Sequence, residues 1–405
     1  MHIRRARIPL VASVALATTM AMAGPAAADG GYDRGGHHQD RGGGGHEVVV
    51  RHGESIQEAV RAAEPGTTIH VEAGTYPESV TIRKDGITLR GHGTVISPPE
   101  DAERTDCETL FPAPPGEEQP PASGICILGD VTVPDFEADP TAEITVNDPV
   151  SHVTVEGVTV AGAPFDGLIG VGTTDLTVRD SKFEDNGGYG AASFTTERTA
   201  FHGNAAVGNT EAGFYVGDSP ESGADVRRNY SADNAMGFFF RNASHGEARG
   251  NVAEENCLGI LVLAGAPGPA THWQIKGNEV RANNGLEGDR AEICASPPPV
   301  TGAGILLVGA QDVEVRRNLV TGHVATGESL VSGGIVVRGT LTAADFPPPA
   351  EGEEAEEFPP PILPTGEVED NVLHDNRPDV FARDAEGMEF DDNRCGTSDP
   401  VGLCG

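Results

Sequence analysis

The sequence predicts an all-β solenoid, a single-stranded parallel β-helix in which each coil of the chain stacks on the next. The first observation is a nine-residue pattern: an apolar residue, two further residues, an asparagine, four residues and a second asparagine. Clear copies span residues 201–209, 226–234, 248–256, 275–283 and 368–376. The second is a glycine followed by apolar residues after each copy, as in Gly213-Phe214 and Gly259-Ile260. The third is the spacing of the copies, about 20 to 30 residues, which is typical of one β-helix coil.

The first asparagine of each copy marks one coil. These anchors are Asn204, Asn229, Asn251, Asn278, Asn318, Asn371 and Asn393, with Ser181 and Val158 at the same place in two weaker copies. The intervals from Asn278 to Asn318 and from Asn318 to Asn371 are long and contain insertions, so each is counted as one coil with a decorated turn. The pattern predicts about ten to twelve coils.

Two apolar columns accompany the anchors. Three residues before them stand Val155, Val178, Phe201, Val226, Ala248, Ile275, Val315, Val368 and Phe390, and two residues after them stand Val160, Phe183, Ala206, Ser231, Ala253, Val280, Val320, Leu373 and Cys395. Because side chains alternate along a strand, both columns are expected to point into the core. Asparagine tolerates left-handed geometry and bonds to turn backbone, so the asparagines are predicted to form structural ladders at a bend.

The N-terminal segment is expected to be a secretory signal peptide of about residues 1–28. Arg4, Arg5 and Arg7 form its charged start, residues 8–23 are its apolar run, and Ala26-Ala27-Ala28 is a cleavage site. A secreted, extracellular protein without a membrane span follows from this reading. Residues 29–46 are rich in glycine and histidine and are predicted to be a flexible linker.

The β-helix proper is expected from residue 47 to 405, and its entrance should be closed by a short helix. Ser55-Ile56-Gln57-Glu58 is a capping-box sequence, followed by an amphipathic segment with Val60 and Ala63 on the same side as Ile56. Short strands are expected at residues 67–71, 80–82 and 87–89, with a turn at 74–76. A helix over the first coil would shield its open edge and core.

The acidic composition excludes some partners. The formal net charge is −35, and removal of the three arginines of the signal takes it to −38. Such a charge argues against nucleic acid and anionic membranes as general partners. Much of it lies in two proline-rich insertions, at about residues 98–124 and 342–364, which are predicted to be mobile, extended loops.

Six cysteines in a secreted chain predict disulfides. They are Cys107, Cys126, Cys257, Cys294, Cys395 and Cys404. Counting alone allows about fifteen pairings. Pairing of sequence neighbours is the simplest, because it closes the first acidic loop, ties down the insertion after Cys257 and fixes the C-terminus.

The N-terminal region and the asparagine repeats together resemble the pectin-lyase-like superfamily of right-handed parallel β-helix proteins. The matching stretches are residues 56–60, 66–69 and 73–76, and the repeat is similar to the parallel β-helix repeat of that superfamily. The resemblance implies the right-handed fold and a place among proteins that act on or bind extracellular polysaccharides. It covers most of the chain but points to no single activity.

The catalytic signatures of individual branches are missing. Of the polygalacturonase-like motifs only Gly91-His92-Gly93 occurs, without the paired carboxylates that glycoside hydrolysis needs, and it is expected to be a turn. An alginate-epimerase-like site would place an Asp-Pro-His near a tyrosine, and Tyr189 has no such neighbour in the sequence. Arg241, after a run of three phenylalanines, is expected at a turn.

One surface column has an unusual charge pattern. Two residues before the anchors stand Glu156, Arg179, His202, Arg227, Arg249, Lys276, Arg316, Glu369 and Asp391. This column is adjacent to an inward one and should point outward, so six successive coils would carry a basic row about 24 Å long. Stacked like charges cost free energy unless something offsets them.

Two interpretations of this row stay open. In the first, an acidic row four residues after the anchors, with Asp185, Asp233, Glu255 and Asp375, holds the basic side chains by lateral salt bridges. In the second, the row is a track for an acidic glycan, bound by Arg179, Arg227, Arg249, Lys276 and Arg316. Asp185, Asp233 and Glu255 are then the candidate ligands of a Ca²⁺ ion that neutralises the acid group.

The sequence therefore predicts a secreted, monomeric β-helix protein that binds an extracellular polysaccharide. Lyase-like cleavage of a uronate polymer is the furthest activity that the residues allow, and an enzyme would be of the polysaccharide lyase or glycoside hydrolase type. No residue is singled out as catalytic. The alternative is a non-catalytic scaffold or adhesion protein of the cell envelope. A basic row open to solvent favours the glycan, and a row fully paired with acids favours the scaffold.

Overall fold

The computed structural model describes residues 46–110, 119–134, 142–265, 268–295, 299–346 and 358–404. The predicted signal peptide and nearly all of the linker lie outside these ranges, as do parts of both acidic insertions, and the domain boundaries stay predictions. Within the described ranges, no helix is long and apolar enough to cross a membrane.

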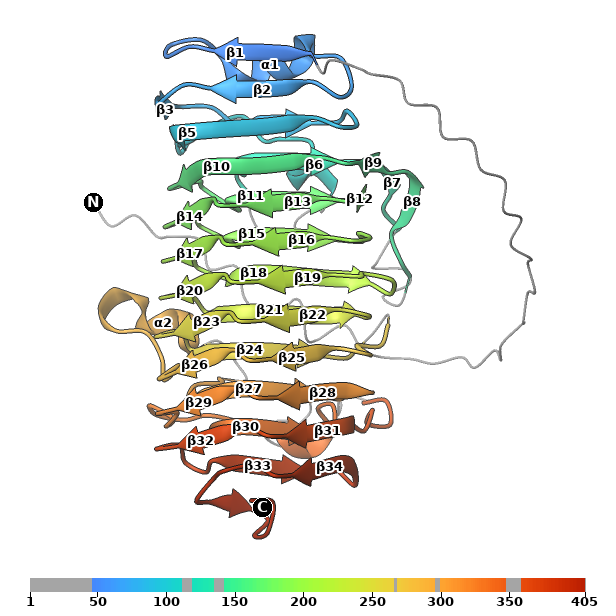
Figure 1. The fold of residues 1–405 in the computed structure, drawn as a ribbon, viewed down its shortest axis with the longest axis vertical. Helices are drawn as coiled ribbons and strands as arrows, with labels where there is room; N and C mark the ends of the chain where they lie inside the picture. Colours follow the sequence, from blue (N-terminus) through green and yellow to red (C-terminus); the bar gives the residue numbers. More distant parts are fainter. Residues whose placement is uncertain are drawn as a thin grey trace, which may run out of the picture.

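The described chain winds into a right-handed parallel β-helix, as the sequence predicts (Figure 1). Each coil contributes one strand to an 11-stranded sheet, called sheet B, and then one or two strands to a 20-stranded bent sheet, called sheet A. In a central coil the chain runs through β18 (Ala212–Ser219) in sheet B and then β19 (Asp225–Arg227) and β20 (Tyr230–Ala232) in sheet A. Eleven rungs in sheet B agree with the predicted coil number.

The remaining strands repeat this order. Sheet B contains β4 (Val80–Ile82), β6 (Ile125–Leu128), β11 (Leu168–Val171), β15 (Ala191–Phe194), β21 (Met236–Ala243), β24 (Leu258–Leu263), β27 (Ala303–Val308), β30 (Gly333–Arg338), β33 (Val380–Arg383) and β35 (Ser398–Asp399). The first ladder of sheet A contains β1 (Glu47–Val50), β2 (Thr68–Val71), β5 (Thr88–Ile96), β10 (Thr154–Ala161), β13 (Thr177–Arg179), β16 (Ala200–His202), β22 (Glu247–Arg249), β25 (Gln274–Lys276), β28 (Val313–Arg316), β31 (Thr365–Glu369) and β34 (Gly387–Asp391). Its second ladder contains β3 (Gly74–Tyr76), β14 (Lys182–Glu184), β17 (Ala205–Val207), β23 (Val252–Glu254), β26 (Glu279–Arg281), β29 (Leu319–Thr321) and β32 (Val372–His374), while β5 and β10 extend into both ladders.

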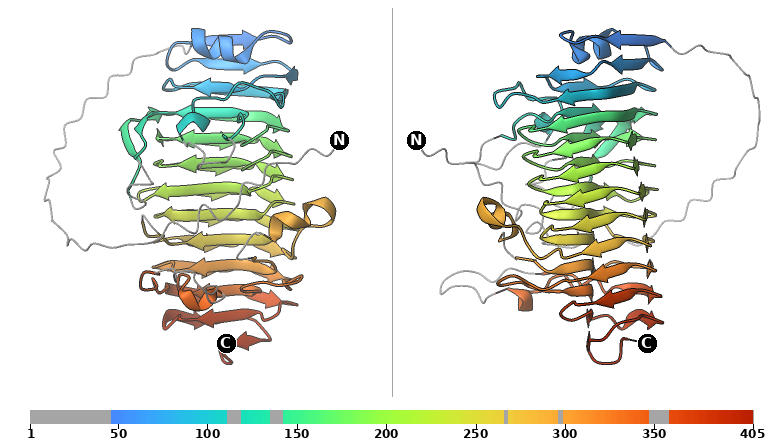
Figure 2. Two further views of the ribbon diagram at one scale, coloured as in Figure 1. Left: turned by 180° about the vertical axis from the view of Figure 1, so that it is seen from behind. Right: turned by 60° about the vertical axis from the view of Figure 1, so that its left-hand side comes forward.

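The elements outside the coils are short. Strands β7 (Asp130–Thr132) and β8 (Thr145–Asp148) pair antiparallel, and β9 (Val150–Ser151) pairs with β12 (Thr173–Thr174). The helical turns are α1 (Ile56–Ala62), η2 (Glu108–Leu110), η3 (Gly288–Arg290), α2 (Ala291–Cys294) and η4 (Ala343–Asp345). The turn α2 stands away from the body of the coil stack (Figure 2).

The core is the interior of the coils, and both predicted inward columns form it. The column from Val155 to Val368 is fully buried, as are Val160, Phe183 and most of the second column. Phe390 and Cys395, in the last coil, are only partly buried. The alternation of inward and outward side chains along each short strand explains why spacing alone found these positions.

The helix α1 covers the first coil, with Ile56, Val60 and Ala63 buried as expected. The capping box is only half formed. The hydroxyl of Ser55 accepts from the Glu58 backbone N–H at 3.1 Å, but the Glu58 carboxylate pairs with Arg61. Glu78 instead accepts the backbone N–H groups of Ile56 and Gln57, at 2.8 and 3.1 Å. A residue from the next coil thus completes the cap.

Two predicted turns are parts of strands. Residues 74–76 form β3, and Gly91-His92-Gly93 lies inside β5, where Gly93 has a φ of +71°. The strand β5 continues through the bend between the two ladders of sheet A, whereas β2 and β3 are separate strands. The glycine permits the left-handed conformation that the bend requires, so the strand turns without ending.

The described part of the first acidic insertion packs against the coils. The carboxylate of Glu108, almost fully buried, accepts from the Thr105 backbone at 2.6 Å and the Ser123 backbone at 3.1 Å. Cys107 is disulfide-bonded to Cys126 in β6, which fixes this insertion against the outer face of sheet B. Cys257–Cys294 and Cys395–Cys404 are the other disulfides, so the pairing is that of sequence neighbours.

Candidate functional site

The asparagines form two continuous ladders of buried side chains along the stack of coils, as predicted. In the first, the side-chain N–H of Asn229 donates to Asn251 Oδ1 at 3.1 Å, and that of Asn251 donates to Asn278 Oδ1 at 3.0 Å. The second contains Asn186, Asn209, Asn234, Asn256, Asn283, His323 and Asn376. The ladder amides also bond to core-strand carbonyls, as Asn251 does to Val226 O at 2.9 Å. Their donors and acceptors are therefore used within the fold.

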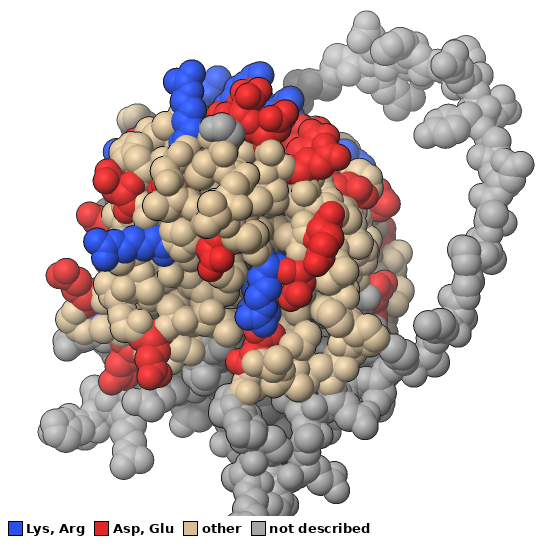
Figure 3. Space-filling view, turned by 90° about the horizontal axis from the view of Figure 1, so that it is seen from below, with Lys and Arg blue, Asp and Glu red and all other residues tan. Residues whose placement is uncertain are grey.

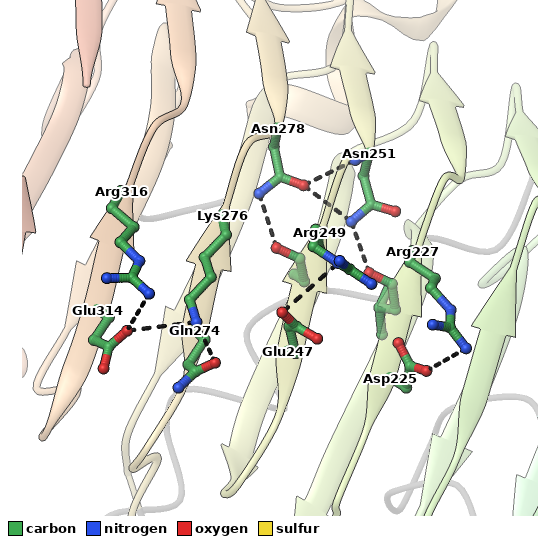
Figure 4. Close-up of polar contacts among 12 residues, drawn as sticks. Asp225, Arg227, Glu247, Arg249, Asn251, Gln274, Lys276, Asn278, Glu314 and Arg316 are labelled. Atoms are coloured by element: carbon green, nitrogen blue, oxygen red, sulfur yellow. Dashed lines mark hydrogen bonds and ion pairs between the residues drawn. The ribbon is translucent and has the colours of Figure 1, made fainter. Parts of the chain in front are cut away.

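The predicted charged column is a real row on the outer face of sheet A. The register of the parallel strands aligns Glu156, Arg179, His202, Arg227, Arg249, Lys276, Arg316, Glu369 and Asp391 on neighbouring rungs, with Arg90 above Glu156. We call these residues the charged row. Figure 4 shows its middle part, with the basic side chains lying over acidic and amide side chains of the same strands.

Acids pair with every basic member of the charged row. Glu156 lies between Arg90 and Arg179 and forms ion pairs with both. Asp225 pairs with Arg227 at 2.8 Å and with His202 at 2.9 Å. The remaining pairs are Arg249–Glu247 at 3.7 Å, Lys276–Glu314 at 3.5 Å, Arg316–Glu314 at 3.8 Å and Arg316–Glu369 at 3.2 Å. The row is thus neutralised in place, as the first interpretation requires.

The partner acids are not the ones predicted. Asp225, Glu247 and Glu314 stand two residues before Arg227, Arg249 and Arg316 on the same strands. Residues i and i+2 of a strand share one face, so these acids are the nearest available. Glu156 and Glu369 are members of the row and pair with arginines of neighbouring strands. Asp185, Asp233 and Glu255 instead lie at turn positions with positive φ, after the second ladder of sheet A.

The role of Asp185, Asp233 and Glu255 as Ca²⁺ ligands stays a prediction. Among the described residues, no three His, Cys, Asp or Glu side chains are grouped so that they could hold a metal ion. An arginine approaches this surface instead: the guanidinium of Arg290 donates to Asn209 O at 2.8 Å and to Asp233 O at 2.7 Å. Burial lowers its pKa, against the opposing effect of Asp233 and Asp185. The cation beside these acids is therefore part of the chain.

A second polar cluster lies on the outer face of sheet B. Tyr215 projects from β18 and packs between the rings of Tyr189, Phe194 and Phe239, with ring centroids 4.8, 4.6 and 5.2 Å away. Tyr215 is 1% exposed and Phe239 is 6% exposed, while Tyr189 and Phe194 are only partly buried. These rings form an apolar floor with an open rim.

Ionisable groups surround this floor. Arg241 on β21 interacts with Tyr215 and lies 3.8 Å from Asp218, measured from Nη1 to Oδ2. Burial opposes the charge of Arg241, but Tyr215 and Asp218 outweigh it and raise its pKa. Arg241 was expected at a turn; it lies within β21 because the strand extends past its phenylalanines. We call Asp166, Tyr189, Glu211, Tyr215, Asp218 and Arg241 the tyrosine cluster.

Two carboxyl groups complete the tyrosine cluster, Asp166, which is buried, and Glu211, which is partly buried. Burial raises the pKa of Glu211 to about 7, and burial raises that of Asp166 well above its ordinary value, although Asp166 accepts the Tyr189 N–H at 2.8 Å. Burial followed by the charge of Glu211 also raises the pKa of Tyr189. Groups with such displaced pKa values, gathered beside a partly open surface, mark a candidate site for proton transfer.

Comparison with known proteins identifies the architecture. Residues 166–342 match the family model of the right-handed β-helix region. No curated protein sequence matches the chain significantly. The mannuronan C-5 epimerase AlgE4 A-module of Azotobacter vinelandii is 18% identical, with 85% of this chain and 91% of that chain covered and a TM-score of 0.53. The family 28 exopolygalacturonase of Yersinia enterocolitica is 14% identical, with 87% and 76% covered and a TM-score of 0.51.

The chain has the right-handed parallel β-helix fold. At these identities the likeness concerns the fold, and the chemistry has to be argued from the residues of this chain.

Most of the tyrosine cluster was missed by the sequence analysis, which considered Tyr189 and Arg241 singly. A usable signal was present. The glycine-apolar pattern places Phe214 inward, so alternation places Tyr215 outward, in register with Phe239 and Leu261. Asp166 and Glu211 precede β11 and β18, and no residue spacing brings them together with Arg241. Only the stacking of coils does so.

Proposed function

We propose that the protein is exported and binds an extracellular polysaccharide along the outer face of sheet B. The observation that carries this proposal is the tyrosine cluster, an aromatic floor bordered by an arginine that is paired with Asp218 and by the carboxyl groups of Asp166 and Glu211. Ligand sites are commonly apolar and aromatic surfaces with a few placed polar groups. The names of the two compared structures, a mannuronan epimerase and an exopolygalacturonase, support a polysaccharide as the ligand.

The same cluster supports a reaction by proton transfer, of the uronate-lyase type. With a pKa near 7, Glu211 both accepts and donates protons at neutral pH. The guanidinium of Arg241 offers charge-assisted hydrogen bonds to the carboxylate of a uronate sugar. Abstraction of the proton beside that carboxylate, with its charge neutralised by arginine, leads to elimination of the glycosidic oxygen and an unsaturated product.

The experiment is to offer the purified protein pectate, alginate, hyaluronan and a heparinoid, each with Ca²⁺ and with a chelator. Binding is measured by affinity electrophoresis, and lyase action by the ultraviolet absorbance of the unsaturated product. Tyr215→Phe retains the ring and removes the O–H group that interacts with Arg241. We expect it to weaken binding or turnover on the polymer that the wild type uses.

Tyr230→Phe is the matched control. Tyr230 carries the same hydroxyl on sheet A, is 38% exposed and bonds Glu254 at 2.8 Å. If Tyr215→Phe and Tyr230→Phe show equal binding and turnover on a polymer that the wild type binds, the proposed site is contradicted.

A scaffold or adhesion role in the cell envelope is the second candidate. The complete pairing of the charged row favours it, because a neutralised row offers little to an acidic glycan. Around the end of the stack near the C-terminus, acidic and basic side chains also lie side by side (Figure 3). Absence of binding and of product on the whole panel would favour this second role.

A further inference from the structure

Arg338 is a buried arginine on the outer face of sheet B. It lies in register with Val308 on β27 and Arg383 on β33, so apolar and basic residues share one outward column. Its side chain is 2% exposed. Arginine is rarely buried to this extent unless an anion and hydrogen-bond acceptors compensate its charge.

The compensating anion comes from the second acidic insertion. Asp345, in η4, has a side chain that is 1% exposed and lies 2.7 Å from Nη2 of Arg338. Its other oxygen accepts from Nη2 of Arg383 at 3.0 Å. Thr342 adds its backbone N–H at 2.9 Å and its hydroxyl at 3.2 Å. Burial acts against the charge of Asp345, but Arg338 and Thr342 outweigh it and lower its pKa. The carboxylate is therefore held ionised between two guanidinium groups.

The fit between the two arginines and Asp345 is incomplete. Nε of Arg338 donates to Gly339 O at 3.1 Å, while its buried Nη1 has no hydrogen-bond partner among the described residues. Arg383 is 47% exposed and is also 3.6 Å from Asp384. Buried hydrogen-bond donors are almost always satisfied. The unused Nη1 of Arg338, beside the single small carboxylate of Asp345, therefore indicates that this position can take a larger anion.

Asp345 also belongs to a segment that the coil does not need. Strands β30 and β33 pair directly, so the rungs are complete without η4. Arg241 of the tyrosine cluster stands in the same outward column, with Leu263 and Val308 between it and Arg338. Three rungs separate the two arginines by about 14 Å along the sheet. A polymer with repeated carboxylates that lies along sheet B would pass both.

We propose that Arg338 and Arg383 form a second carboxylate-binding position on the outer face of sheet B, and that Asp345 occupies it as an intramolecular substitute for a uronate carboxylate. This inference rests on the proposed function for its ligand, an acidic glycan chain. The insertion then acts as a competitor, and the glycan must displace η4 to reach Arg338.

The test compares Asp345→Asn with Asp384→Asn. Both replacements remove one negative charge near Arg383, but only the first removes the partner of Arg338. Binding of polygalacturonate is measured against dextran, a neutral polymer. We expect Asp345→Asn to tighten polygalacturonate binding about ten-fold over the wild type and over Asp384→Asn, within the usual range for coupled sites. Addition of Arg383→Gln should remove the gain, and dextran binding should not change.

Thr342→Ala is a second variant that keeps Asp345 and therefore leaves no buried arginine unpaired. It loosens η4 and should give a smaller gain of the same sign. Equal binding by Asp345→Asn and Asp384→Asn, or a gain that survives Arg383→Gln, overturns the inference. Wild-type binding that depends on Tyr215 without any gain in Asp345→Asn overturns this inference alone. Absence of polygalacturonate binding in both the wild type and Asp345→Asn rejects this inference together with acidic-glycan binding.

Discussion

His323 takes the place of an asparagine in the second ladder, where its Nε2 accepts from the Asn283 side chain at 3.1 Å. Its Nδ1 donates to Asn376 Oδ1 at 2.9 Å, and the ring is fully buried. The ladder thus needs a neutral imidazole with the proton on Nδ1. Burial lowers the pKa of His323 to about 4 from an ordinary value of 6.5.

The burial of neutral His323 predicts that the free energy of unfolding falls at acidic pH. The unfolded chain protonates His323 below pH 6.5, whereas the folded chain does so only near pH 4, so stability is present above 6.5 and is lost as the pH falls toward 4. The loss attributable to His323 is about 3 kcal/mol. His323→Asn should restore the amide ladder and remove that part of the pH dependence. Denaturant unfolding of both proteins across this pH range measures it, and parallel curves would contradict the assignment.

Glu211 should make the stability of the fold depend on pH in the opposite direction. Its pKa rises from 4.5 to about 7 in the fold, so its contribution is fully present below pH 4.5 and is lost as the pH rises through 7. The stability of Glu211→Gln, measured relative to the wild type, should therefore be higher at pH 8 than at pH 4. In any polymer assay that detects turnover, the wild-type rate should show an inflection near pH 7 that Glu211→Gln lacks. Glu279→Gln, on sheet A, is the control and should behave like the wild type.

The first ladder predicts a large loss of stability for Asn251→Ala. Its amide bonds to Asn229, Asn278 and Val226 O inside the chain. The truncation leaves buried partners unsatisfied, and we expect a loss of about 3 kcal/mol or more in the free energy of unfolding. Asn147→Ala, at an exposed asparagine, should change it by less than about 0.5 kcal/mol. A small effect at Asn251 would show that the ladder relaxes or recruits water.

The charged row predicts a mild effect on stability. Replacing Arg227, Arg249 and Lys276 together with alanine removes partly exposed pairs, each worth roughly 0.2–1 kcal/mol. The fold should remain, with a total loss of about 2 kcal/mol or less by denaturant unfolding. If the row is also a glycan track, acidic-glycan binding should weaken in the same variant. Unchanged binding beside a loss in Tyr215→Phe would assign the glycan to sheet B alone.

Arg290 is expected to stabilise the fold by linking its insertion to earlier coils. The insertion closed by Cys257–Cys294 brings its guanidinium to the carbonyls of Asn209 and Asp233, which belong to earlier coils. Arg290→Met keeps the aliphatic length and leaves these carbonyls without that donor. We expect a loss of about 2 kcal/mol and faster amide hydrogen exchange around α2. Arg317→Met, at an exposed arginine 3.3 Å from Asp370, should leave both measurements near wild type.

The spacing of residues in the repeats was enough to predict the coils. The fixed spacing around the asparagines assigned inward, ladder and surface positions, because each coil repeats the same local geometry and contacts only its neighbours. It found the charged row for the same reason. It placed the acids of that row wrongly, since Asp225 and Glu247 precede their partners within the strand while the predicted acids follow the anchor.

The contacts between coils of different composition could not be predicted from the repeats. The insertions follow no period, so their folding onto sheet B, with Cys107 bonded to Cys126 and Asp345 between two arginines, depends on contacts across many residues. The tyrosine cluster likewise joins residues of four consecutive coils, from Asp166 to Arg241. Its displaced pKa values arise from burial, which is a property of the packed chain rather than of any residue spacing.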